Sequence, residues 1–299
     1  MLLERANGVH WTWLVYLEMF LAGVAAGAIV AAAILEFSGR GRSSAARTAH
    51  LLAFPLMAVS GILLIVDLSR PDRFWHMVIM SERFLPMLKP WSPMSAGMLL
   101  LTAFSGASFV SFVDALVGAG RLRLGRWHEG NTIHGGPLGV VWATISALLA
   151  LGVGIYSAVL LTTSAIPGWA HLTMIPAVYV ATALITGVAA VVLIQAIRRN
   201  VDADVLSLAH ANLWLIGWWL ITVGLFLLTL MSSASASVLL TGIPLAAILV
   251  AIVLAGIVPL AVALFRPLAP AVRLMLSSVL VLVGGFLMRY AIVMAPQLH

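Results

Sequence analysis

The sequence predicts an all-α integral membrane protein, with eight transmembrane helices in a single polytopic domain that covers residues 1–299. Two observations lead to this prediction. Hydrophobic residues make up 63% of the chain and charged residues 9%, against about half and about a quarter in soluble proteins. In addition, eight apolar stretches reach the roughly 20 residues that a helix needs to cross a bilayer core about 30 Å thick.

The eight predicted helices follow one another along the chain. They run over about residues 11–36, 48–67, 92–118, 136–162, 170–197, 206–231, 237–265 and 270–293. The first stretch is too long for a cleaved signal peptide and has little basic character before it, so we expect it to remain as a membrane span. Together the helices occupy most of the chain and leave no room for a soluble domain.

The basic residues predict the orientation of the bundle. Ten of the 16 Lys and Arg residues lie in or beside the connections that follow the first, third, fifth and seventh helices, and six lie on the other side. Cytoplasmic loops of membrane proteins are enriched in Lys and Arg. We therefore expect both termini and the connection at 67–97 on the outer, periplasmic side of the cytoplasmic membrane of a prokaryote. The net charge of +6 is then a sign of topology and does not indicate nucleic-acid binding.

Polar side chains of several helices converge in the outer half of the predicted bundle. Glu18 lies seven residues, roughly 10 Å, below the start of the first helix at Trp11, and Asp67 ends the second helix. Tyr156 lies about two turns below the outer end of the fourth helix, and the eighth helix brings Arg289 to the same face. Ionisable groups inside the hydrocarbon are costly and are functional candidates by default. The sequence thus predicts one shared site in the outer leaflet.

Other polar side chains have simpler interpretations. Glu36 and Arg40, at the inner end of the first helix, have the spacing of an i, i+4 ion pair. Asp114 is either a cap at the inner end of the third helix or the inner end of a proton path from Glu18 that also involves Arg289. Several histidines at helix ends fit capping or interfacial roles better than metal ligation, and several tryptophans fit an interfacial belt: His50, His134, His171, His210, Trp13, Trp169, Trp218 and Trp219.

The connection between the second and third helices is the densest polar segment of the sequence. It carries Arg70, Asp72, Arg73 and Trp75, and Arg and Trp are favoured anchors of protein interfaces. The chain has no cysteine, so it lacks the thiolates that iron–sulfur clusters need. A redox function would therefore depend on the metal centres of a partner, and we expect this connection to dock one.

Three segments carry distinctive motifs. They are HWTW at 10–13 with FLAGVAAGA at 20–28, DLSRPDRFWHM at 67–77 with SPMSAG at 92–97, and GIYSAVLLTTSAIPGWA at 154–170. These segments resemble the membrane subunits of polysulfide reductase and its relatives, the NrfD family. The second motif is the most specific because it is long and ordered. The resemblance covers about the first 170 residues and is weaker afterwards.

The resemblance implies a haem-free subunit that exchanges electrons between membrane quinone (menaquinone or ubiquinone) and a ferredoxin-like iron–sulfur subunit, which in turn joins a molybdopterin catalytic subunit. Tyr156 matches the family's tyrosine that binds the quinone headgroup, and we expect His10 and Trp11 beside it. Glu18 and Asp67 would move protons to or from the outer solvent. Relatives commonly carry an aromatic residue or His at the position of Glu18, which favours proton transfer over direct quinone binding for this carboxylate. No metal site is expected in the chain itself.

Three other classes of protein stay open. A secondary transporter also buries ionisable residues, but it should show broken helices near the midplane and an internal repeat. A haem b anchor subunit needs pairs of axial histidines. A purely structural scaffold would assemble with other subunits without binding quinone.

Overall fold

The structure is a computed structural model that describes residues 11–68, 70–80, 84–87, 89, 91–122, 133–164, 166, 169–170, 172–233, 236–264 and 269–297. Within these residues the chain is all-helical apart from its connections, and eight helical segments are long and apolar enough to cross a membrane. The predicted number of spans is confirmed. His10 and His171 lie outside the described residues.

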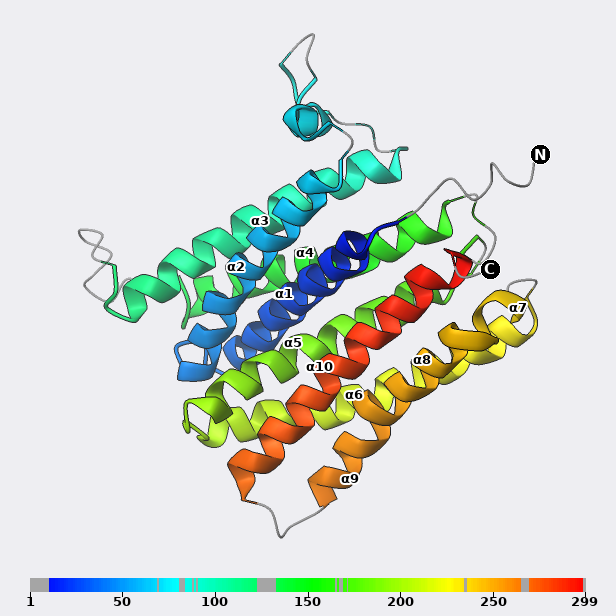
Figure 1. Cartoon of the computed structure of the whole chain (residues 1–299). Coiled ribbons are helices and arrows are strands. Elements are labelled where there is room, and N and C mark those ends of the chain that lie inside the picture. The colour runs from blue at the N-terminus through cyan, green and yellow to red at the C-terminus, as the bar shows by residue number, and fades with distance from the viewer. Residues whose placement is uncertain are drawn as a thin grey trace, which may run out of the picture.

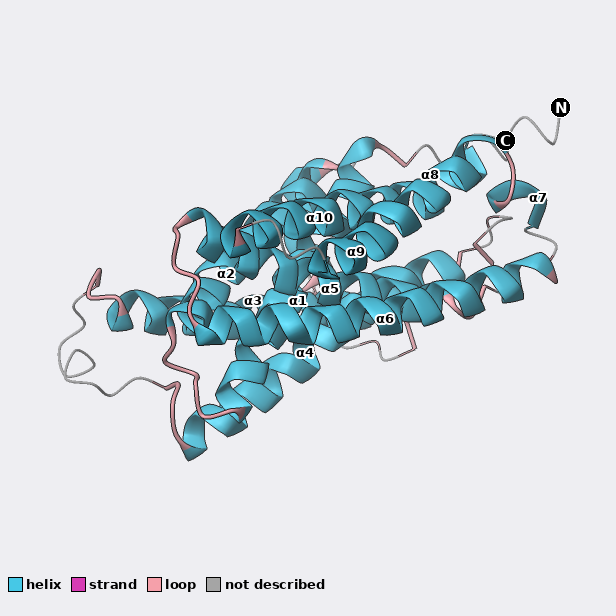
Figure 2. Cartoon of the chain, turned by 90° about the horizontal axis from the view of Figure 1, so that it is seen from below, coloured by secondary structure: helices cyan, strands magenta, loops and turns pink. Residues whose placement is uncertain are grey.

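The long helices run side by side along one direction and alternate in polarity (Figures 1 and 2). We call the end of the bundle at which α1 begins the Trp13 end, and the end at which α1 finishes the Phe37 end. The spans are α1 (Trp13–Phe37), α2 (Ser44–Val66), α3 (Pro93–Gly118), α4 (Pro137–Thr162), α5 (Ile175–Ile197), α6 (Ala203–Met231), the compound span Gly242–Leu264, and α10 (Pro270–Met294).

Side-chain caps set two helix starts earlier than the apolar pattern predicts. The hydroxyl of Ser43 accepts a hydrogen bond from the backbone N–H of Ala46, so α2 begins at Ser44 and not near residue 48. The carboxylate of Asp202 accepts from the backbone N–H of Val205, and α6 begins at Ala203. Both caps satisfy N–H groups that have no partner within the helix.

The seventh span is the least regular one. The short helix α7 (Ala236–Leu239) precedes it, and the span itself is built from α8 (Gly242–Ile252), the π-helical turn η4 (Val253–Ile257) and α9 (Val258–Leu264). Pro259 follows η4, and a proline inside a helix lacks an N–H and clashes with the preceding turn. A π-helical turn absorbs this disturbance, so the backbone stays helical throughout the span.

The centre of the bundle is formed by α1 and α5, the two most buried spans. They cross closely at Gly27 and Gly187, where a Cβ atom on Gly27 would overlap the carbonyl group of Ala183. Small residues at such crossings let helix backbones approach each other. The helices α2, α3 and α4 lie on one side of this central pair, and α6, α8 and α10 lie on the other (Figure 1).

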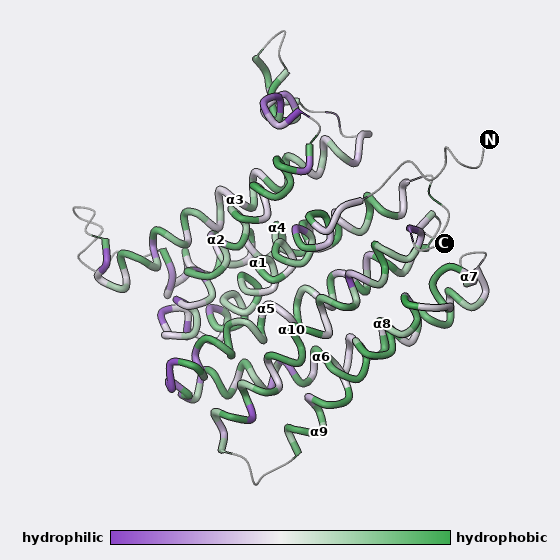
Figure 3. Tube along the Cα trace, viewed as in Figure 1, coloured by the Kyte–Doolittle hydropathy of each residue, from purple (hydrophilic) through white to green (hydrophobic). Residues whose placement is uncertain are grey.

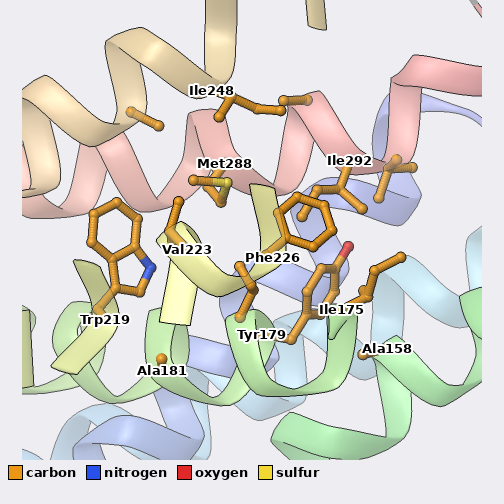
Figure 4. Close-up of a cluster of buried hydrophobic side chains, with 14 of the residues drawn as sticks. Ala158, Ile175, Tyr179, Ala181, Trp219, Val223, Phe226, Ile248, Met288 and Ile292 are labelled. Carbon is orange, nitrogen blue, oxygen red and sulfur yellow. The ribbon is translucent and has the colours of Figure 1, made fainter. Parts of the chain in front are cut away.

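One apolar core packs α5 against α6, α8 and α10, with Tyr179, Phe226 and Met288 among its side chains (Figure 4). It also holds Trp169 and Trp219, which are fully buried and donate hydrogen bonds to the carbonyl of Ile292 and the hydroxyl of Thr182. The interpretation of these two tryptophans as interfacial belt residues is therefore wrong. They are core residues whose N–H groups have partners inside the protein.

Apolar residues cover the helices along most of their length, and hydrophilic residues gather at the helix ends and in the connection after α2 (Figure 3). That connection contains the 3₁₀ helix η2 (Pro71–Met77). None of the residues of η2 is buried, and it stands away from the bundle beyond the Trp13 end of α2 (Figure 1).

Candidate functional site

A cavity of about 250 Å³ opens between α1, α2, α3 and α4 near the Trp13 end. This volume is just below the roughly 300–1,000 Å³ that is usual for small-molecule sites. Its walls are mostly Leu, Val, Met and Ala, and its polar side chains are few. Four residues singled out in the sequence line it together: Trp11, Glu18, Asp67 and Tyr156.

Glu18 is the deepest of the carboxylates in this cavity. It lies on α1, is nearly buried, and accepts a hydrogen bond of 2.9 Å from the hydroxyl of Ser60 on α2. Asp67 and Arg289 are close enough to act on its charge. A carboxylate in this position can accept or release a proton at the wall of an otherwise apolar cavity.

Asp67 joins two helices at the mouth of the cavity. The hydroxyl of Thr12 donates a hydrogen bond of 2.7 Å to its carboxylate, and the same hydroxyl accepts from the backbone N–H of Leu14 as the N-cap of α1. The start of α1 is thereby tied to the end of α2. Beside it, the ring of Trp11 packs on Trp169 with 4.9 Å between ring centroids, which fixes one flat wall of the opening.

Tyr156 comes from α4, and its ring packs against the backbone of α3 at Gly97. A Cβ atom on Gly97 would overlap the Tyr156 ring. Gly97 belongs to the SPMSAG motif and Tyr156 to the motif at 154–170, so two of the three distinctive motifs meet at this contact. Tyr156 is also within electrostatic reach of Glu18, so a ligand in the cavity would meet a hydroxyl donor and a carboxylate together.

Arg289 lies behind the cavity, in the protein interior between α1, α5 and α10. It is 1% exposed, donates to the carbonyl of Tyr179 at 3.3 Å, and lies over the Tyr179 ring at 4.4 Å. Gly23 on α1 leaves room for its guanidinium. The ion pairs of the described residues do not include Glu18 with Arg289, so Arg289 acts on Glu18 only as a neighbouring charge.

The polar residues expected at the inner end form a separate cluster at the Phe37 end. Asp114 is buried and accepts from the backbone N–H of Ile133 at 2.9 Å. Glu36 accepts from the backbone N–H of Gly135 at 2.7 Å. The predicted pair of Glu36 with Arg40 is wrong, because Arg40 forms its ion pair with Asp204 of α6 at 3.0 Å. Across the residues that the structure describes, no hydrogen bond joins this cluster to Glu18.

The candidate docking residues share the exposed segment around η2. Arg70, Asp72, Arg73 and Trp75 all have solvent-accessible side chains. Asp72 and Arg73 form a loose, exposed ion pair at 4.0 Å, and Trp75 packs on His76. These residues are clear of the cavity, so the structure separates two surfaces: a cavity between helices and a charged, aromatic segment outside the bundle.

Sequence reasoning did not single out Thr12 and Gly97. Both lie inside distinctive motifs, HWTW and SPMSAG, but neither has a reactive side chain. Their roles depend on a contact across helices, Thr12 with Asp67 and Gly97 with Tyr156. His10 belongs to the same motif as Thr12 and lies outside the described residues.

The described residues contain no group of three or more His, Asp or Glu side chains that could hold a metal ion.

Comparison with known proteins gives two matches. The family model for polysulphide reductase, NrfD, matches residues 1–299. The C subunit of polysulfide reductase from Wolinella succinogenes is 29% identical over 203 residues, which are 64% of the present sequence. The match spans 60% of the length of that relative. With eight apolar helices among its described residues and a family match over residues 1–299, the protein is a multi-pass membrane protein that belongs to the NrfD polysulphide reductase family.

Proposed function

We propose that this protein is the quinone-reacting membrane subunit of a respiratory oxidoreductase complex, in which electrons pass between membrane quinone and a peripheral iron–sulfur subunit. The observation that carries the proposal is the cavity between α1, α2, α3 and α4, because it brings Glu18, Asp67 and Tyr156 to one apolar space at the Trp13 end. A quinone headgroup is a flat ring with two oxygens, and its apolar tail belongs between helices and lipid.

In this proposal the Tyr156 hydroxyl donates a hydrogen bond to one headgroup oxygen, and the ring of Trp11 forms an apolar wall at the opening. His10 is our candidate for the second oxygen. Oxidation of a quinol to a quinone releases two electrons and two protons. Glu18 and Asp67 are placed to accept those protons, since proton transfer needs a group within hydrogen-bonding reach of the reacting oxygen.

The electrons need an acceptor outside this polypeptide. With no cysteine in the sequence, the thiolate ligands of an iron–sulfur cluster must come from a partner. We propose that Arg70, Asp72, Arg73 and Trp75 dock that iron–sulfur subunit, and that it connects to a molybdopterin catalytic subunit. The segment around η2 supports this, because it exposes Phe74, Phe84 and Trp91 beside charged residues, the mixture that interfaces favour.

The same proposal covers topology. We propose a single polytopic domain in the cytoplasmic membrane of a prokaryote, with the Trp13 end facing outward, because basic residues are more frequent at the Phe37 end. Protons released at Glu18 would reach the outer solvent by the shorter route, past Asp67 at the mouth of the cavity. Ser60 donates a hydrogen bond directly to Glu18, whereas the hydroxyl of Thr102 on α3 donates to the carbonyl of Met98 in its own helix.

Quinone binding by the purified protein tests the proposal. A quinone in the cavity would quench the fluorescence of Trp11, and Tyr156→Phe removes one hydrogen bond worth about 0.5–1.5 kcal/mol. We expect the dissociation constant of a short-chain quinone to rise about two- to twelvefold in this variant. Tyr290→Phe is the matched control, because Tyr290 packs against Tyr16 and does not line the cavity. Equal affinity in wild type and Tyr156→Phe would contradict the assignment.

A further inference from the structure

A second cluster of ionisable side chains lies at the Phe37 end of the bundle, and the quinone reaction does not use it. Glu36 of α1, His50 of α2, Asp114 of α3 and His134, just before α4, are all buried. Glu36 is 18 residues from Glu18 on the same helix, which is five turns or about 27 Å. The cluster and the quinone cavity therefore lie at opposite ends of α1.

Contacts join the members of this cluster. The carboxylate of Glu36 lies 3.7 Å from Nδ1 of His134. The ring of His134 stacks on that of His50, with 4.1 Å between centroids and 23° between planes. Asp114 of α3 also acts electrostatically on His134. His134 is thus under the influence of two carboxylates that come from different helices.

Some polar atoms of this cluster have no hydrogen-bond partner among the described residues. Each carboxylate accepts one backbone N–H, Glu36 from Gly135 and Asp114 from Ile133. The second oxygen of Glu36 and Nδ1 of His50 are buried and make no hydrogen bond to any residue that the structure describes. Buried charge without full pairing is costly. One added proton would convert a neutral imidazole into a partner for the carboxylates.

A second proton on the histidines is opposed by their stacking. Two positive charges on rings this close repel each other, so the histidine pair holds at most one. The other charged groups nearby are Arg42, whose Nε donates to the carbonyl of His134 at 2.8 Å, Arg47, which donates to the carbonyl of Gly118, and Arg198, near Thr48 of α2. Their positive charges also limit the uptake to a single proton.

The cluster has a route to solvent. A cavity of about 450 Å³ lies against Glu36 and is lined also by Phe37, Gly39, Arg42 and Gly136. Phe37, Gly39 and Gly136 are exposed. A proton can therefore reach the carboxylate of Glu36 from the Phe37 end and pass to His134.

We propose that Glu36, His50, Asp114 and His134 form a proton-binding site that takes up a single proton from the solvent at the Phe37 end of the bundle. The site goes beyond the proposed quinone reaction and does not depend on it, since the two lie at opposite ends of α1. Burial lowers the pKa of His134 from its usual value, and the charges of Asp114 and Glu36 oppose that effect. Protonation therefore occurs at a lower pH than for an exposed histidine.

Nitrogen NMR of the whole protein, labelled with ¹⁵N-histidine and held in lipid bilayers, tests the site over about pH 8 to about pH 4.5. We expect one histidine of the stacked pair to gain a proton within this range, and that signal to disappear in His134→Asn. In Glu36→Gln the midpoint should fall by about one pH unit, a tenfold weaker proton affinity, because a nearby carboxylate raises the pKa of an imidazole. His210→Asn is the control and should leave the low-pH signal in place.

Three results would overturn the proposal: both stacked histidines gaining a proton, neither gaining a proton while the protein stays folded, or a midpoint unmoved in Glu36→Gln. The side of access is tested in liposomes with the single cysteine of Phe37→Cys, in a protein that has no other. An impermeant maleimide measures which fraction of the molecules faces that end outward. Acidifying the outer buffer should protonate the site in that fraction, and protonation of the opposite fraction would contradict the route.

Discussion

At the scale of single residues, the contact between Gly97 and Tyr156 is the most sensitive point of the cavity. A Cβ atom at Gly97 would overlap the tyrosine ring, whereas one at Gly106 on the same helix would meet nothing within 4 Å. We expect Gly97→Ala to displace Tyr156 and weaken quinone binding at least as much as Tyr156→Phe does. Gly106→Ala should bind as wild type does. Equal binding by both variants, measured by fluorescence quenching, would show that the position of Tyr156 does not matter.

Glu18 is the residue whose role is most specifically chemical. Glu18→Gln keeps an oxygen that can accept the hydrogen bond from Ser60 but cannot take up a proton. We expect quinol oxidation by the intact complex to slow by about 10²-fold or more, while the dissociation constant for quinone changes little. Ser60→Ala leaves the carboxylate in place and should have a smaller effect on turnover. A turnover in Glu18→Gln equal to that of the wild type would exclude Glu18 as a proton acceptor.

The sequence predicted that Glu18, Asp67 and Tyr156 share one site, and all three line the same cavity; their roles in quinone and proton chemistry are predictions. Glu18, Asp67 and Tyr156 were predictable because ionisable or hydrogen-bonding groups within apolar helices are rare, and their depth follows from helix geometry. The partner of Glu36 was not predictable. Its i, i+4 spacing with Arg40 is a local signal, whereas its actual contacts come from Gly135 and His134, about 100 residues away in the sequence.

At the scale of helices, the crossing of α1 and α5 determines how closely the bundle packs. Alanine is usually more favourable than glycine in a helix by about 0.5–1 kcal/mol. At Gly27, however, its methyl group would overlap the Ala183 carbonyl, and overpacking typically costs about 1–3 kcal/mol. We expect Gly27→Ala to lower the thermal unfolding temperature in detergent.

Gly217→Ala on α6 is the control for this prediction, because a Cβ atom there meets nothing within 4 Å. It should leave the unfolding temperature unchanged or raise it slightly. If the two variants unfold at the same temperature, the close crossing contributes nothing to stability.

The helix boundaries show which local features the apolar pattern does not contain. The eight spans were predictable from length and composition, but α2 and α6 start three or more residues early because Ser43 and Asp202 cap them. The π-helical turn before Pro259 also follows from a backbone effect that hydropathy does not measure. Because that span remains helical throughout, it does not offer the unwound segment at which a transporter binds its substrate.

At the scale of the whole molecule, the proposal requires a partner at the segment around η2. Arg73 and Trp75 are exposed and are not among the residues that line the cavity. Replacing both with Ala should release the iron–sulfur subunit from the complex, because truncated interface anchors typically cost about 2 kcal/mol or more each. Quinone binding by the membrane subunit should survive. Co-purification of the subunits checks this, and a complex that stays intact in the double variant would show that docking takes place elsewhere.

The central claim is that the quinone headgroup lies between α1, α2, α3 and α4 at the Trp13 end. Photolabelling of the intact complex with an azidoquinone, followed by mass spectrometry of the peptides, tests it most directly. The proposal predicts labels near Trp11 to Ala22, Leu63 to Asp67 and Val153 to Leu160, the segments that line the cavity, and loss of these labels when excess quinol is added. A different cavity is lined by His210 of α6 and Arg273 of α10, and labels that excess quinol displaces only from there would contradict the claim.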